Sequence, residues 1–204
     1  FETQSTYKVA VQVDDPTVGK ILDAVSDTFK LKIGDVSPEI INGTSGDDPD
    51  LTGGTDSDQI FGFAGLDILN GGKGKDELDG GAGDDTLTGG RSQDILTGGL
   101  DADTFVFTHI KDSGKGSSKR DTITDFDPSE DLIDLSLIDA KAGGGDNDFN
   151  WKGTNKLKKK GDLKYTDKGD HVIVSGDVDG DRKADFQIKI AGTGLALDQD
   201  DFIL

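Results

Sequence analysis

The chain has 204 residues, a formal net charge of −19 at pH 7 and only 32% hydrophobic residues. High net charge with low hydrophobicity is typical of disordered sequences. This acidic excess argues against partners such as nucleic acid or anionic membrane surfaces. The chain lacks cysteine, which excludes disulfides and thiol chemistry, and no run approaches the roughly 18 apolar residues that cross a bilayer.

Residues 1–41 contain two stretches of alternating apolar residues, from Tyr7 to Val13 and from Phe29 to Ile33, and such alternation predicts β-strands. The run from Tyr7 to Glu39 resembles the last two strands of a cadherin-like β-sandwich. Two strands cannot form a sandwich, so this segment is expected to be the tail of an upstream domain or a hairpin on the next segment. With no Met at position 1 and no signal peptide, the chain is expected to be the carboxyl-terminal part of a longer protein.

A repeat with a step of nine residues runs from Gly53 to Phe107. Its first position is glycine (Gly53, Gly62, Gly71, Gly80, Gly89, Gly98), its sixth aspartate (Asp58, Asp67, Asp76, Asp85, Asp94, Asp103) and its eighth a large apolar residue (Ile60, Leu69, Leu78, Leu87, Leu96, Phe105). Glycine suits turns that need positive φ or close approach, and aspartate supplies a hard oxygen ligand. Each repeat is therefore predicted to be a turn plus a short strand, and two repeats form one coil whose stacking buries the apolar column.

This pattern matches the nonapeptide G-G-x-G-x-D-x-U-x, and the sequence resembles the RTX family, whose repeats wind into a parallel β-roll around calcium. The resemblance implies side-chain or carbonyl ligands at Gly54, Asp56, Asp58, Gly65, Asp67, Gly72, Gly74, Asp76, Gly81, Gly83, Asp85, Gly90, Asp94, Gly99, Asp101 and Asp103. Ions between turns one coil apart would pair Asp58 with Asp76, Asp67 with Asp85, Asp76 with Asp94, and Asp85 with Asp103. A degenerate unit ending at Asp48 offers a fifth site with Asp67, so four or five calcium ions are expected.

The local charge of the repeats indicates what calcium would do. Residues 43–107 hold 14 Asp and Glu against three Lys and Arg, so they are expected to repel one another until cations neutralise them. Calcium is then the predicted folding trigger. The fourth position, usually glycine, is Asp56, Ser92 and Asp101 in three repeats, and these turns are expected to bind less tightly or to bend.

Residues 108–204 are predicted to cap the roll with antiparallel strands. The block from Arg120 to Ser136 resembles the one that follows the repeats in serralysin-type carboxyl-terminal domains, and the similarity continues through the predicted strands 149–151, 161–165, 171–177 and 184–190. Asp121, Asp125 and Asp134 either close the last ion sites or are solvated acids on edge strands.

Three further features of this cap carry predictions. Asp177, Asp179, Asp181 and Asp185 have the spacing at the start of an EF-hand loop but lack its final Glu, so the turn is expected to bind one calcium or to be a plain turn. The ending Leu197–Leu204 looks like the export signal of type I secretion substrates, or is a final docked strand. The cluster Lys156–Lys160, with Trp151 nearby, is either a polysaccharide- or cell-surface-binding tip or a solvated turn.

No catalytic constellation is found in the sequence. His109 and His171 are far apart, and there is neither an HExxH motif nor a Gly-x-Ser-x-Gly nucleophile. The chain is thus predicted to be a non-enzymatic all-β fragment: a tail (1–41), a parallel β-roll (42–107) and an antiparallel cap (108–204). Its predicted role is a calcium-binding module of a secreted Gram-negative protein exported by type I machinery. The alternatives are an adhesin module or an accessory domain of a secreted hydrolase or epimerase.

Overall fold

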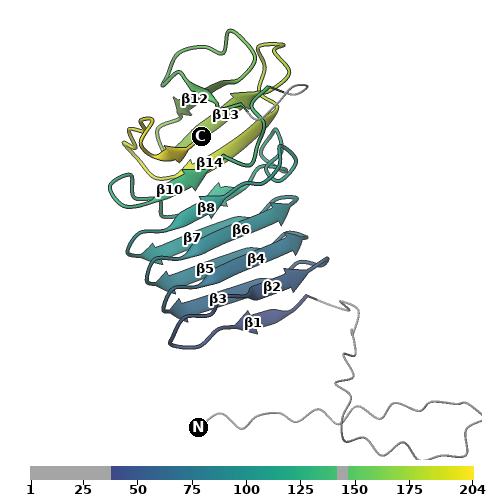
Figure 1. Ribbon diagram of the computed structural model, residues 1–204, viewed down its shortest axis with the longest axis vertical. Coiled ribbons are helices and arrows are strands. Elements are labelled where there is room, and N and C mark those ends of the chain that lie inside the picture. Colours follow the sequence, from purple (N-terminus) through teal and green to yellow (C-terminus); the bar gives the residue numbers. More distant parts are fainter. Residues whose placement is uncertain (1–37, 142–146) are drawn as a thin grey trace, which may run out of the picture. The chain divides into compact units, whose positions relative to one another are not determined.

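The computed structural model of the chain describes residues 38–141 and 147–204, which lie in one compact unit, 34–204. Regular structure in these residues consists of β-strands alone (Figure 1). None of them forms a helix long and apolar enough to cross a membrane. The two predicted strands before Glu39 lie outside the described residues, and the cadherin-like tail stays a prediction.

Two sheets contain all of the strands in the described residues. One has the order β1 (Ile40–Asn42), β3 (Gln59–Ala64), β5 (Glu77–Ala82), β7 (Ile95–Leu100), β9 (Thr122–Ile123), β14 (Phe186–Ala191), β13 (His171–Asp177), β12 (Asp162–Asp167), β11 (Asn150–Trp151). The other has the order β15 (Phe202–Ile203), β10 (Leu132–Asp134), β8 (Thr104–Val106), β6 (Thr86–Arg91), β4 (Ile68–Lys73), β2 (Leu51–Gly54). The chain thus alternates between two stacks of parallel strands (Figure 1).

The register of these stacks shows that one coil contains two repeats. Ile60 pairs with Leu78 in one sheet, and Leu69 pairs with Leu87 in the other, so equivalent residues one coil apart are separated by two steps of nine. The predicted parallel β-roll is confirmed by this pairing.

The core of the roll is the column of residues at the eighth repeat position. From Ile60 to Phe105 all six are fully buried, because alternation along a strand directs every second side chain to the same face. Ile123 and Ile133 continue the column, since Ile123 pairs with Leu96 and Ile133 with Phe105.

The cap continues the roll before it changes topology. Strands β9, β10 and β15 add to the stacks in parallel, and antiparallel pairing is confined to β12, β13 and β14. The strands expected at 149–151, 161–165, 171–177 and 184–190 appear as β11 to β14, with small shifts of their ends. The all-β fold, a parallel roll with antiparallel cap strands, agrees with the prediction.

Candidate calcium-binding columns

The aspartates at the sixth repeat position form a buried ladder along each side of the roll. Each of the six is at most 2% exposed. The backbone N–H of Asp58 donates to Oδ1 of Asp76 at 2.9 Å, and that of Asp67 donates to Oδ1 of Asp85 at the same distance. The same bond joins Asp76 to Asp94 and Asp85 to Asp103. The structure therefore brings together every aspartate pair that the repeat predicts.

The second carboxylate oxygen in this ladder has a different environment. Among the described residues, the Oδ2 atoms of Asp67, Asp85, Asp94 and Asp121 are buried with no hydrogen-bond partner. A buried carboxylate oxygen without a partner is costly, and native proteins usually satisfy such atoms. A divalent cation that accepts hard oxygen ligands fits this donor set.

Burial is the main cause of raised pKa values along the ladder. It raises the pKa of Asp85 to about 6, that of Asp94 and of Asp103 to about 7, and that of Asp121 to about 9. The N–H donor from the neighbouring coil lowers each pKa, and the charges of neighbouring carboxylates raise it again. Without a cation, burial therefore makes ionisation of these carboxyl groups harder than in water, most of all for Asp121.

Backbone carbonyls of the turns add a second set of oxygens. Gly83 has φ of 120°, and a Cβ there would collide with the carbonyl oxygen of Gly65, one coil earlier. The same arrangement recurs at Gly72, Gly74, Gly81, Gly90 and Gly99, which face the carbonyls of Gly54, Asp56, Phe63, Gly72 and Gly81. The carbonyls of Asp56 and Gly65 belong to turns and the other four lie near the ends of strands; each comes close to the equivalent residue one coil later.

Three residues that are not glycine adopt the same left-handed turn conformation. Phe63, Ser92 and Asp101 have φ of 78°, 108° and 76°, at positions where other repeats have glycine. Such conformations cost on the order of 1–3 kcal/mol each for residues with a Cβ. Of the three residues at the fourth repeat position that were expected to bind less tightly or bend the turn, Ser92 and Asp101 keep the positive φ of the equivalent glycines, whereas Asp56 does not have it; weaker binding at these turns stays a prediction.

The ladder extends beyond the repeats at both ends. The N–H of Asp48 donates to Oδ1 of Asp67 at 2.8 Å, which brings together the predicted fifth pair. At the other end, Asp94 donates to Oδ1 of Asp121 and Asp103 to Oδ1 of Asp131, both at 2.9 Å. The sequence analysis missed Asp131, although it precedes the buried Ile133 by two residues, as in every repeat.

The other two acids proposed to close the columns differ in position. Asp125 accepts hydrogen bonds from the N–H groups of Gly98 and Gly99, and its charge is among the causes that raise the pKa of Asp103 and of Asp131. It therefore lies near the end of that column, and its role as a ligand stays a prediction. Asp134 accepts from the N–H of Ser136 two residues later, which is a local turn.

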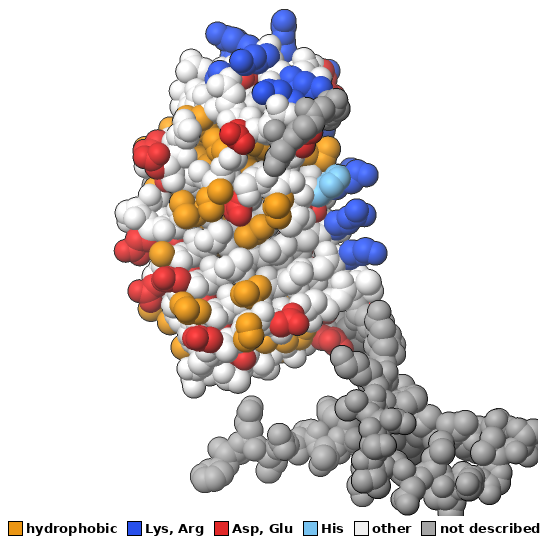
Figure 2. Space-filling model, viewed as in Figure 1, with side chains coloured by type: hydrophobic (Ala, Val, Ile, Leu, Met, Phe, Trp, Pro, Cys, Tyr) orange, Lys and Arg blue, Asp and Glu red, His pale blue; other side chains and the backbone are white. Residues whose placement is uncertain are grey.

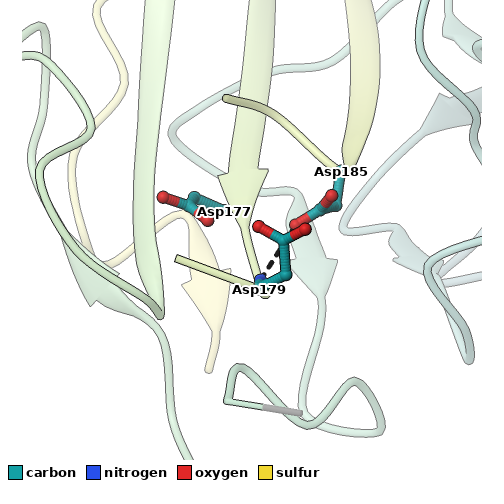
Figure 3. Close-up of side chains that lie close together, drawn as sticks. All are labelled: Asp177, Asp179 and Asp185. Atoms are coloured by element: carbon teal, nitrogen blue, oxygen red, sulfur yellow. Dashed lines mark hydrogen bonds between the residues drawn. The ribbon is translucent and has the colours of Figure 1, made fainter. Parts of the chain in front are cut away.

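The second predicted metal turn lies between β13 and β14. Oxygens of Asp177, Asp179 and Asp185 lie within 4.8 Å of one another, and Figure 3 shows the carboxylates of Asp179 and Asp185 side by side. Asp181, the fourth predicted ligand, interacts instead with Lys183. Both oxygens of Asp177 also accept backbone N–H groups, from Gly180 and Arg182, and these bonds help to shape the turn.

Trp151 and the cluster Lys156–Lys160, which were predicted to form one ligand-binding tip, have different environments. Trp151 of β11 is half-buried. Its ring stacks on that of Tyr165 in β12 and also contacts that of Phe202 in β15. Lys156, Lys158 and Lys159 are exposed, and the N–H groups of Lys158 and Lys159 donate to Asp162.

Three solved structures are similar to this chain, and the first of them supports the fold. The AlgE6R2 subunit of the mannuronan C5-epimerase from Azotobacter vinelandii is 27% identical, with a TM-score of 0.50 over 82% of this chain and 92% of that one. The AlgE6R3 subunit is 30% identical, with a TM-score of 0.33 over 79% and 80%. The extracellular lipase LipA from Serratia marcescens is 16% identical, with a TM-score of 0.35 over 83% and 40%.

A comparison with curated proteins gave no match. The family model described as peptidase M10 serralysin C terminal matches residues 50–204, which is well over half of the chain. This match begins just before β2 and includes every described strand except β1. The chain therefore belongs to the serralysin carboxyl-terminal family and is an RTX-type β-roll module.

Proposed function

We propose that this module folds when calcium enters the two aspartate columns. The observation that supports the proposal is the set of buried Oδ2 atoms without hydrogen-bond partners in Asp67, Asp85, Asp94 and Asp121. Those of Asp67, Asp85 and Asp94 lie close to the glycines Gly62, Gly80 and Gly89 at the first repeat position. The residues thus fit a hard cation held between turns, and Asp121 and Asp131 would add a final site to each column.

The expected energy is large enough to decide whether the module folds. Extracellular calcium modules bind with dissociation constants of roughly 10⁻⁴–10⁻³ M. At ten times the dissociation constant, each site adds about 1.4 kcal/mol, so the four or five sites of the repeats alone add about 6–7 kcal/mol. Domain stabilities are typically about 5–15 kcal/mol, and calcium binding would therefore be a major part of the total.

A calcium titration of the whole chain followed by far-ultraviolet circular dichroism tests this proposal. We expect a cooperative gain of β signal with calcium and none with magnesium at the same concentration, because magnesium dehydrates reluctantly and demands a smaller octahedral site. A chain that shows its full β signal in chelator would contradict the proposal, since the cap would then supply the stability by itself.

The same switch would serve export of a secreted protein. An unfolded acidic chain can pass through a type I channel from a cytoplasm low in calcium and then fold outside. The segment Leu197–Leu204 is our candidate for the export signal; in the folded module it ends in β15, which pairs with β10, so it would be read before folding. Deleting 198–204 should reduce the exported fraction in cells with a type I exporter, and undiminished export would exclude this segment as the signal.

A second candidate function is binding of an acidic polysaccharide, with the module as an accessory part of an adhesin or enzyme. The likeness to the AlgE6R2 subunit of a mannuronan C5-epimerase supports the accessory role. In either case we assign no reaction to this chain. The turn with Asp177, Asp179 and Asp185 remains a prediction for one additional calcium.

A further inference from the structure

A cavity of about 520 Å³ lies against the face of the antiparallel cap strands, and its wall is strongly basic. Its charged lining residues are Arg120, Lys156, Lys164, Lys168 and Arg182, and its lining includes no Asp or Glu. In a chain with 41 acidic and 22 basic residues, a cavity walled by five cations and no acid is unexpected. Figure 2 shows Lys and Arg side chains gathered at this end of the molecule.

These five cations are available to an external anion. Within the described part of the chain, none of them has a carboxylate oxygen within 4.0 Å, whereas Lys115, Lys152 and Lys183 each have one. Like charges placed around one cavity repel one another. A bound anion would relieve that repulsion, so the arrangement favours a ligand with several negative charges.

The floor of the cavity is formed by side chains in register across three strands. Lys164 on β12 lies opposite Ser175 on β13, which in turn lies opposite Gln187 on β14. The next pair on β12 and β13 is Thr166 opposite Ile173. Ser175 and Ile173 are buried, so the floor combines hydroxyl and amide groups with an apolar patch, surrounded by flexible cations.

One of the two arginines is held at the cavity by a strained turn. Arg182 has φ of 68°, and its N–H donates to Oδ2 of the fully buried Asp177 at 2.9 Å. This bond fixes the backbone of Arg182 in a conformation that residues with a Cβ rarely adopt. The turn therefore fixes the point from which the side chain of Arg182 leaves the backbone beside the cavity.

We infer that this cavity binds a short stretch of acidic polysaccharide, with the cations contacting carboxylates of successive sugars. The inference rests on the polysaccharide-binding function proposed above and assigns it to a site that does not include Trp151 and that shares only Lys156 with the exposed lysine cluster. Hydroxyl and amide groups on the floor suit sugar hydroxyls, and the apolar patch suits a sugar ring. Arginine and lysine bind carboxylates through charge-assisted hydrogen bonds.

The test is a binding titration of the calcium-saturated whole chain with a fluorescently labelled oligogalacturonate hexamer. We expect saturable binding that weakens as salt increases, and no binding of a neutral maltohexaose. The double variant Lys164→Gln/Arg182→Gln should bind about tenfold more weakly, since it removes two charge-assisted contacts. The matched control Lys158→Gln/Lys159→Gln removes the same charge from exposed lysines outside the cavity and should bind as the parent does.

Other outcomes would overturn the inference in distinguishable ways. Loss of binding only in the Lys158/Lys159 control, or equal loss in both variants, would overturn the cavity but leave polysaccharide binding in place. If the folded parent chain binds no hexamer, the polysaccharide function fails together with the cavity. Binding of vesicles with anionic phospholipid, but not of the hexamer, would assign the cations to a phosphate-bearing surface and overturn the inference. Circular dichroism of each variant in calcium checks that the module is folded.

Discussion

The substitution Asp85→Asn should change stability in opposite directions with and without calcium. In chelator, we expect the variant to be more stable than the parent. Asp85 is buried with an Oδ2 that has no hydrogen-bond partner among the described residues, and its burial raises its pKa to about 6. A neutral amide in that place costs less than a buried charge, and Asn keeps the oxygen that accepts the N–H of Asp67.

In saturating calcium, the same variant should be less stable than the parent. Asp85 belongs to two predicted pairs, with Asp67 and with Asp103, so two sites would lose an anionic ligand. If both sites are lost at ten times the dissociation constant, the free energy of unfolding falls by about 3 kcal/mol. For a domain of this size, that corresponds to a decrease in melting temperature of roughly 6–12 °C.

Two measurements check this reversal of sign. Thermal melting in calcium reports the loss, and folding induced by trimethylamine N-oxide in chelator reports the gain, because that osmolyte favours burial and brings a weakly folded chain into range. The neighbouring exposed residue provides the control: Asp84→Asn should leave both values nearly unchanged. A variant that loses stability equally in calcium and in chelator would show that Asp85 has only a structural role.

The sequence was sufficient to predict the columns because they depend on local spacing. A residue at every ninth position repeats its environment in each coil, so the buried Leu78 and the buried Asp76 can be predicted from any neighbouring repeat. The 18-residue register between paired strands follows from the same count. Predicting the aspartate pairs needed no knowledge of contacts that are distant in the sequence.

The rest of the cap could not be predicted in this way because its contacts join distant segments without a repeat. Trp151 was expected at a binding tip, but it packs on Tyr165 and Phe202, which the sequence does not place beside it. The basic cavity likewise draws Arg120 and Lys168 from separate connections. Asp131 is different: its spacing from Ile133 follows the repeat, and a search for the shorter D-x-apolar pattern after Phe107 would have found it.

Without calcium, the stability of the module should fall as pH rises from about 5 toward 9. The folded-state pKa values of Asp94 and Asp103 are raised to about 7 and that of Asp121 to about 9, from an ordinary value of 3.8, mainly by burial. The folded state therefore binds more protons than the unfolded state in this range. Linkage requires that this contribution is fully present below the unfolded pKa and is lost as pH rises through the folded values.

With calcium, the dependence on pH should reverse, because carboxylate ligands must lose their protons before the ion binds. Circular dichroism in chelator at pH 5.5 and at pH 8, repeated in saturating calcium, measures both slopes. We expect more β signal at pH 5.5 than at pH 8 in chelator, and a higher melting temperature at pH 8 in calcium. The variant Asp94→Asn/Asp121→Asn should flatten the slope in chelator, since two of the titrating groups are gone. If the parent shows the same β signal at both pH values in chelator, the buried carboxylates do not control folding, and the columns would be structural ladders rather than a calcium switch.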